Sequence, residues 1–528
     1  MSVGQAAGAI AGGATQRKTH VSEEDLAGAH AATAVGRWLP VVAALLGVVT
    51  FLLVRRSLTD DAYITLSYAK NLAMHGTWGL VPGEPANSAT SPLNVLLLGA
   101  LTLVTRVSGA PHPVLALGAL TVAAGAALGW SWLRLVRALR IPPAAGLLGV
   151  VLVLVNPFLL SAFGLEVLLI PAVLMLLTVF AVEGRPILYG AAAGLAVLTR
   201  LDLVVFVVLI AASAASIRRR AWLALVAAVA VAAPWFLFSW FAFGSFVPDT
   251  LVIKQSQASL FAPWSYVNGP VMYALGRPIV VLLAFAPAVL GVLALAAWAA
   301  ARFAVRWPEV PPLGPVAALG AGGVVSYVVY SLLDVGPYHW YYVTPVVATG
   351  AFAVAAFGVW QGRARERPTL RRGPPLAALG LVGVLTLALA GVDGAQGVPW
   401  RSPVIFGNWA SAQDYARVGQ ELGKRLNGAT VASPGEIGTL AYYCDCAILD
   451  VFSDRGQVVG LVNDQIAAAG PVMRTALRVN YHWFDRSHTP RKVDYRLRYE
   501  SGPASGPDSW QVYSATKGVG HFTLVREV

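Results

Sequence analysis

The sequence predicts an all-α polytopic membrane domain of about eleven transmembrane helices, followed by a C-terminal α/β domain outside the membrane. Hydrophobic residues make up 57% of the 528 positions and charged residues only 12%, and the mean hydropathy is +0.65. Soluble domains are about 25% charged, so this composition requires surrounding lipid. Long apolar stretches alternate with short basic runs, and a more polar stretch begins at residue 393.

Residues 1–36 are rich in Ala and Gly with scattered charges, and no apolar stretch or cleavage site begins there, so we expect a disordered cytoplasmic tail. The net charge of +12 comes from basic runs between apolar stretches, which favours membrane topology over nucleic-acid binding. The two cysteines, Cys444 and Cys446, are too few for a disulfide framework or a zinc site.

The membrane domain is predicted over residues 37–392, with an outer loop at 55–112. A segment at 92–107 is interpreted as re-entrant or interfacial, because counting it as a span would place the arginines at 134–140 outside. Residues 187–217 allow two short helices broken at Thr199–Asp202, or one long tilted helix. The predicted spans are 38–54, 113–133, 142–160, 165–182, 187–199, 203–217, 221–243, 278–301, 312–333, 341–360 and 375–392.

Charge parity supports this arrangement. With the N-terminus inside, the cytoplasmic loops hold fourteen arginines and three acids, as the positive-inside rule requires. An odd number of spans then places residues 393–528 outside. We expect an α/β domain there, with a helix at 411–426 and an Asn427-Gly428 turn. Its strands are predicted at Thr430–Ala432, Ala447–Val451, Val493–Arg498, Trp510–Tyr513 and Phe522–Val525.

Two adjacent acids follow the first span. Asp60 and Asp61 begin a stretch in which Tyr63, Leu66 and Tyr68 lie largely on one side of an amphipathic helix along the membrane interface. Carboxylates in a first helical turn also favour the helix dipole, so the pair allows a capping role alone.

Further ionisable residues fall at the same side of the predicted membrane. Such groups at membrane depth are costly and often mark functional sites. Each has a structural alternative: Arg200 and Asp202 pair with each other, Lys254 extends to headgroups, or His339 joins an aromatic belt. The set is Glu166, Arg200, Asp202, Asp249, Lys254 and His339.

These residue types indicate a reaction class. Arg and Lys bind phosphate well, and a carboxylate can deprotonate an acceptor hydroxyl as it attacks a sugar carbon. Together they predict glycosyl transfer from a lipid-linked phosphate donor.

Several strings resemble one known family, in order along nearly the whole chain. They resemble GT-C-fold glycosyltransferases that use polyprenyl-phosphate sugars, in particular the actinobacterial terminal arabinofuranosyltransferases that cap cell-wall arabinan. The strings are Asp60-Asp61-Ala-Tyr-Ile-Thr, Ala89-Thr-Ser-Pro92-Leu, Gly164-Leu165-Glu166, Leu198-Thr-Arg200-Leu-Asp202, Phe243-Gly-Ser-Phe-Val-Pro248-Asp-Thr with Lys254, His339 with Pro345, and Gly435-Glu436-Ile-Gly438 with Leu449-Asp450.

The resemblance implies a GT-C type fold and a role for each matched residue. Asp60 would be the general base and Asp61 would orient it or the acceptor. Arg200, Lys254 and His339 would hold the donor phosphate, and Glu166 and Asp202 would shape the sugar pocket, with Asp249 in the substrate-binding set.

The resemblance also implies partners and a location. The donor would be a polyprenyl-phosphate sugar, with arabinofuranose expected, and the acceptor a cell-envelope glycan or glycolipid at the outer face of the plasma membrane. No cofactor is expected to be required, although a divalent cation stays open, and no nucleic acid is expected. Two rival functions are a secondary transporter, which should show related halves, and a catalytically inactive glycan-binding scaffold.

Overall fold

The structure is a computed structural model that describes residues 36–106, 109–305, 313–333, 335–366, 373–397, 400–405, 407–426 and 428–527. The expected N-terminal tail lies outside the described residues except for its last position. The basic residues expected at 306, 367, 371 and 372, the acid at 309 and the turn residue 427 lie outside them as well.

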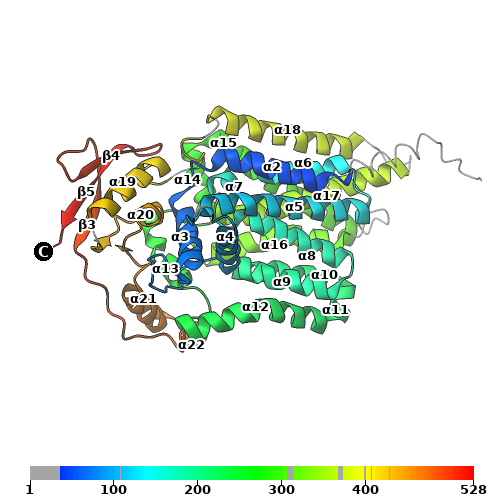
Figure 1. Ribbon diagram of the computed structural model, residues 1–528. Helices are drawn as coiled ribbons and strands as arrows, with labels where there is room; N and C mark the ends of the chain where they lie inside the picture. Colours follow the sequence, from blue (N-terminus) through cyan, green and yellow to red (C-terminus); the bar gives the residue numbers. More distant parts are fainter. Residues whose placement is uncertain are drawn as a thin grey trace, which may run out of the picture.

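The larger part of the molecule is a bundle of apolar helices lying side by side (Figure 1). In the described residues, six helical segments are long and apolar enough to cross a membrane. They contain α5 (Pro113–Leu139), α12 (Ala221–Phe243), α15 (Pro278–Ala299), α16 (Gly314–Leu332), α17 (Val343–Glu366) and α18 (Gly373–Ala395).

Shorter apolar helices complete the bundle. They are α2 (Leu39–Val54), α6 (Pro143–Leu154), α8 (Leu169–Val182), α9 (Pro186–Thr199) and α10 (Val204–Ser213). Each of the predicted spans therefore coincides with an apolar helix, and the chain is a multi-pass membrane protein. The number of eleven crossings stays a prediction. The break at Thr199–Asp202 is present, so the alternative of two short helices is confirmed.

Two helices run across the bundle at the end next to the C-terminal domain (Figure 1). The first, α3 (Asp60–His75), follows the extended Thr59 and ends at Gly76, whose positive φ of 64° closes the helix in the left-handed conformation. The second, α4 (Pro92–Val104), begins where the Ser91 hydroxyl accepts the backbone N–H of Asn94 at 3.3 Å. The predicted helix is thus present, with Tyr63, Leu66 and Tyr68 buried, and its place along the membrane interface stays a prediction.

Short helices connect these elements. They are α7 (Pro157–Ser161), α11 (Ala215–Arg219), α13 (Thr250–Ser256) and α14 (Gly269–Gly276), with 3-10 turns at Glu166–Leu168, Leu201–Leu203, Ala258–Phe261 and His339–Tyr342 and a π turn at Ala300–Ala304.

The C-terminal domain is built on a five-stranded sheet of order β2-β1-β3-β5-β4. All the predicted strands are present, as β1 (Val431–Ala432), β2 (Ile448–Leu449), β3 (Tyr495–Ser501), β4 (Ser509–Ser514) and β5 (Gly518–Arg526). The strand β1 pairs in parallel with β2 and β3, whereas β5 pairs antiparallel with β3 and β4.

The predicted helix is α19 (Ala412–Arg425), which the Ser411 side chain caps by accepting the Asp414 N–H at 3.1 Å. Sequence reasoning missed α20 (Gly438–Cys444), α21 (Arg455–Ala468) and α22 (Pro471–Asn480). Cys444 and Cys446 form a disulfide beside the end of α20.

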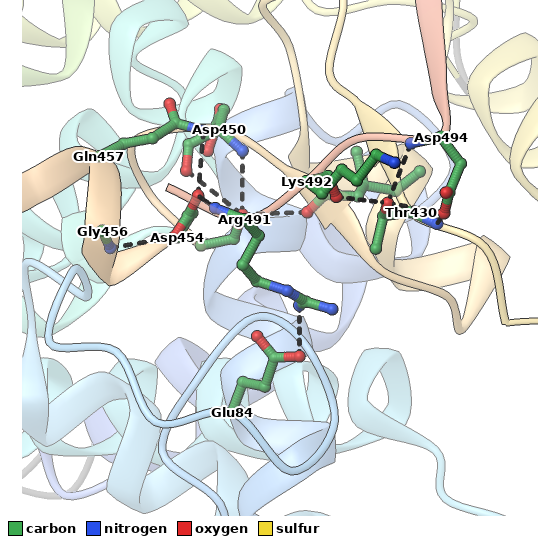
Figure 2. Close-up of polar contacts among 11 residues, drawn as sticks. Glu84, Thr430, Asp450, Asp454, Gly456, Gln457, Arg491, Lys492 and Asp494 are labelled. Atoms are coloured by element: carbon green, nitrogen blue, oxygen red, sulfur yellow. Dashed lines mark hydrogen bonds and ion pairs between the residues drawn. The ribbon is translucent and has the colours of Figure 1, made fainter. Parts of the chain in front are cut away.

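The C-terminal domain is fixed to the 55–112 segment by polar contacts. Figure 2 shows the side chain of Arg491 reaching from the C-terminal domain to Glu84, with which it forms an ion pair. The backbone N–H of Arg491 donates to Asp454 at 3.0 Å, and Asp454 in turn caps α21 by accepting the Gly456 N–H. Arg491 therefore joins the 55–112 segment to the capped start of α21, and this contact connects the two domains.

Candidate active site

Asp60 joins α3 to the C-terminal domain. Its carboxylate accepts the backbone N–H groups of Gly438 at 2.9 Å and Thr439 at 2.7 Å, at the start of α20. A side chain at Gly438 would not fit, because a Cβ atom there would lie 2.0 Å from the Asp60 carbonyl oxygen. Burial raises the pKa of Asp60 to about 6, although the hydrogen bond from Thr439 opposes this rise.

A second buried acid lies nearby in the C-terminal domain. Glu436 accepts the backbone N–H of Trp409 at 3.0 Å and the hydroxyl of Tyr415. Burial, and then the charge of Asp60, raise the pKa of Glu436 to about 8. This junction therefore holds two buried acids whose pKa values are both raised.

Asp61 points elsewhere. Neighbouring residues on a helix lie about 100° apart, so two adjacent carboxylates project in different directions. Asp61 lines a pocket of about 40 Å³, and Asp60 is absent from its lining. The pocket wall consists of Asp61, Ile64, Thr65, Ser88, Ala89, Thr90, Ser91, Leu165, Glu166, Arg200, Thr250, Lys254, Trp340, Tyr341 and Phe452.

Lys254 is the cation nearest to Asp61 in this wall, with 3.6 Å between its ammonium and the carboxylate. The ammonium also lies 4.2 Å from the ring centroid of Tyr338 and 5.5 Å from that of Trp340. Aromatic faces attract a cation without neutralising it. Lys254 is therefore held at the pocket wall by aromatic rings, with Asp61 as the acid that faces it.

Arg200 is held by three oxygen partners. Its guanidinium donates to Glu166 at 2.6 Å, to Asp202 at 2.9 Å and to the hydroxyl of Tyr330 at 2.7 Å. The alternative that Arg200 pairs with Asp202 is therefore confirmed, and Glu166 is a second ionic partner. Two acids balance this one cation, so Arg200 offers less net charge to a phosphate than Lys254 does.

Three expected substrate-binding residues, Asp202, Asp249 and His339, do not line this pocket, and Asp202 reaches its wall only through the bond with Arg200. Asp249 is buried beside it, where its backbone N–H donates to the Asn87 carbonyl at 2.8 Å and burial raises its pKa to about 7. His339 is enclosed by aromatic rings, 4.9 Å from the ring of Trp340 and 6.5 Å from that of Phe158. Asp249 and His339 are both enclosed by neighbouring side chains, and their contact with substrate stays a prediction. The aromatic setting of His339 matches the alternative noted above.

Sequence reasoning missed other residues of the pocket. Ser88 and Phe452 meet at its rim, where the Ser88 hydroxyl donates to the Phe452 carbonyl. The hydroxyl-rich run before Pro92 was a usable signal for Ser88, Thr90 and Ser91. No local signal marks Phe452, because only the docking of the C-terminal domain brings it to the pocket.

A second pocket lies along the same elements and differs in chemistry. It is lined by neutral residues, among them Leu72, Trp78, Leu198, Trp235 and Phe238. The residues that line this second pocket include no cation that could bind an anionic group. Among the described residues, no group of three or more His, Cys, Asp or Glu side chains is placed to hold a metal ion.

The comparisons with known proteins identify the fold. No family model matches the chain, and no curated protein matches it. Solved structures of GT-C glycosyltransferases do match, so the fold is the GT-C fold.

Three of these structures are particularly informative. ArnT from Cupriavidus metallidurans is 15% identical with a TM-score of 0.51, and the match covers 93% of this chain and 98% of ArnT. The Archaeoglobus fulgidus oligosaccharyltransferase is 11% identical with a TM-score of 0.53, covering 88% of this chain and 69% of that one. The mycobacterial arabinofuranosyltransferase AftD is 15% identical with a TM-score of 0.47, covering 92% and 41%. At that TM-score AftD carries no argument about the sugar.

Proposed function

We propose that this protein is a membrane glycosyltransferase that moves a sugar, arabinofuranose, from a polyprenyl phosphate to a cell-envelope glycan or glycolipid. The observation that carries the proposal is the pair of Asp61 and Lys254, which line one pocket 3.6 Å apart. A carboxylate base and an ammonium side by side suit an acceptor hydroxyl and a phosphate leaving group. In support, one solved GT-C structure is ArnT bound to undecaprenyl phosphate.

In this mechanism Asp61 is the general base. The acceptor oxygen forms a bond to the anomeric carbon as the bond from that carbon to the phosphate oxygen breaks. The acceptor proton passes to the Asp61 carboxylate, and the polyprenyl phosphate leaves as an anion next to Lys254. A single displacement inverts the anomeric centre.

The roles of the two acids are therefore exchanged relative to the sequence expectation. Both carboxylate oxygens of Asp60 accept hydrogen bonds from the start of α20. Asp60 therefore acts by positioning α3 and the neighbouring Asp61. Arg200 holds Glu166 at the pocket wall, and Glu166 is the candidate acceptor for the hydroxyls of the sugar.

The proposed site lies at the outer face of the plasma membrane. The C-terminal domain supplies Phe452 to the pocket, so the reaction takes place on the same side of the membrane as that domain. Charge parity places this side outside.

The test is transfer of radiolabelled arabinofuranose from a purified polyprenyl-phosphate donor to an oligoarabinan acceptor, using the full chain in lipid nanodiscs. The expected product carries one added sugar of inverted anomeric configuration, as determined by NMR. Donor binding without transfer would support the scaffold instead, and donor movement across the bilayer of a proteoliposome would support the transporter. Parallel assays with other polyprenyl-phosphate sugars decide the donor.

A further inference from the structure

The helix α22 exposes an apolar stripe. Val472, Ala476 and Val479 follow one another at helical spacing and lie on one side. Val472 is 86% exposed and Val479 is 59% exposed, with Met473 beside them at 50%. The opposite side is buried through Leu477. The helix therefore has apolar residues on both sides, and the C-terminal domain covers only one of them.

The end of α22 is docked on the end of α12 (Figure 1). The indole N–H of Trp240 donates to the Val479 carbonyl at 3.1 Å, and the Asn480 side chain accepts the backbone N–H of Val247 at 2.7 Å. The Gly244 backbone lies so close to this segment that a Cβ atom there would sit 2.4 Å from the Phe484 Cα. This contact fixes the exposed stripe relative to α12.

The surface of α12 is itself apolar and open. Only 17% of its membrane-crossing window is buried inside the protein, and Phe238 and Phe241 are among its exposed side chains. The ring of Phe241 lies 6.0 Å from that of Trp483, just after α22. The exposed stripe of α22 is thus continuous with a surface that faces lipid.

We propose that α22 is an interfacial helix whose stripe enters the bilayer beside α12, in the leaflet on the side of the C-terminal domain. Amphipathic helices that lie in this plane bury their apolar side at the boundary of headgroups and acyl chains. Residues 471–486 hold Arg474, Arg478, Arg486 and His482 against one acid, Asp485. This balance favours anionic headgroups over neutral ones.

The interfacial helix lies behind the active-site lysine. Leu477 and Tyr481 share one apolar cluster with Val252 and Ile253, which directly precede Lys254 on α13. The bilayer contact of α22 therefore sets the position of α13, and with it the height of the Lys254 ammonium relative to the lipid phosphates.

The test measures lipid contact in the full chain. Val472→Cys is labelled with an environment-sensitive dye in nanodiscs that contain phosphatidylglycerol and lipids carrying a nitroxide near the top of the acyl chain. The native cysteines form a disulfide and do not take the label. Val519→Cys on β5, 51% exposed and in the sheet away from the bundle, is the matched control.

The nitroxide should quench most of the fluorescence of the dye at position 472, whereas the dye at position 519 should keep its fluorescence. The second variant, Val479→Asp in the labelled chain, should lower the membrane-docked population about tenfold and restore the fluorescence at 472. Equal fluorescence at 472 and 519 in the parent chain would overturn the proposal. The proposal would also be overturned if the dye at position 472 were protected from the nitroxide in a way that depends on protein concentration. A second copy of the chain would then cover the stripe. The readout does not use sugar transfer, so it stands apart from the test of activity.

Discussion

Replacing the two adjacent acids by Asn separates a catalytic role from a positioning role. Asp61→Asn keeps the size of the side chain but removes the base, so we expect turnover to fall about 10²–10⁴-fold. The thermal stability should stay near that of the parent, because Asp61 lies at an open pocket.

Asp60→Asn should instead keep both turnover and stability. The change removes one of two charge-assisted hydrogen bonds to α20, which costs about 1.5–3 kcal/mol. It also relieves the burial of a charge. The pKa of Asp60 is raised from 3.8 to about 6, and at about 1.4 kcal/mol per pKa unit this corresponds to on the order of 3 kcal/mol at neutral pH. The raised pKa already includes the hydrogen bonds from α20, so removing the charge compensates for the lost bond. We expect a melting temperature no lower than that of the parent and turnover within a few-fold of it.

Asp60→Ala provides the contrast, because it leaves two buried N–H groups of α20 without an acceptor. Each unmade bond costs about 1–3 kcal/mol, so this variant should melt at a lower temperature. The assay is single-turnover transfer at saturating donor, alongside thermal unfolding of each variant in the same nanodiscs. The reasoning would be refuted by an Asp60→Asn protein that melts like the parent but has lost turnover, together with an active Asp61→Asn protein.

The remaining predictions concern the donor phosphate, the buried acids and metal dependence. Lys254→Met should weaken donor binding about tenfold to a hundredfold in a donor titration, whereas Lys424→Met on the exposed side of α19 should not; equal effects would remove Lys254 from the phosphate site. Arg200→Met leaves Glu166 buried without its cation, so it should cost about 3–5 kcal/mol of stability in thermal unfolding; a parent-like melting temperature would contradict the pairing. The pKa of Glu436 is raised from 4.5 to about 8 in the folded chain, so the unfolded chain loses this proton first and stability should fall between about pH 5 and 8, by up to about 1.4 kcal/mol per pH unit. Glu436→Gln should flatten that part of the melting profile, and an unchanged profile would assign the slope to other groups. Chelation by EDTA should leave transfer unchanged, and a loss restored by Mg²⁺ or Mn²⁺ would establish a metal requirement.

The predicted helices and strands matched the structure closely because their signals are local. A long apolar run has few conformations open to it in lipid other than a helix, so each predicted span coincides with one. The five strands and α19 follow from short alternating or periodic patterns and clear turn residues. Of the missed helices, α20 with seven residues is too short for periodicity to identify it, whereas α21 has 14 residues but no one-sided apolar pattern.

The charged residues of the pocket could also be predicted from the sequence, because charged residues within an apolar chain are conspicuous. Asp61, Glu166, Arg200 and Lys254 were all expected from their type and position, and all four line one pocket. Their roles were not determined in this way. Which of two adjacent acids faces the pocket depends on where α20 docks, and α20 lies 378 residues further along the chain at its contact with Asp60.

The charge of Arg200 is balanced by Asp202 and by Glu166, which is 34 positions away, and its third partner, the Tyr330 hydroxyl, is 130 positions away. Only the packing of separate helices brings the two distant partners to it. The burial of His339 and the arrival of Phe452 at the pocket rim have the same origin. Residue type and local periodicity determine which groups are present and in which element each lies. The direction of each side chain, and its charge after pairing, depend on contacts between segments far apart in the sequence, which local patterns do not encode.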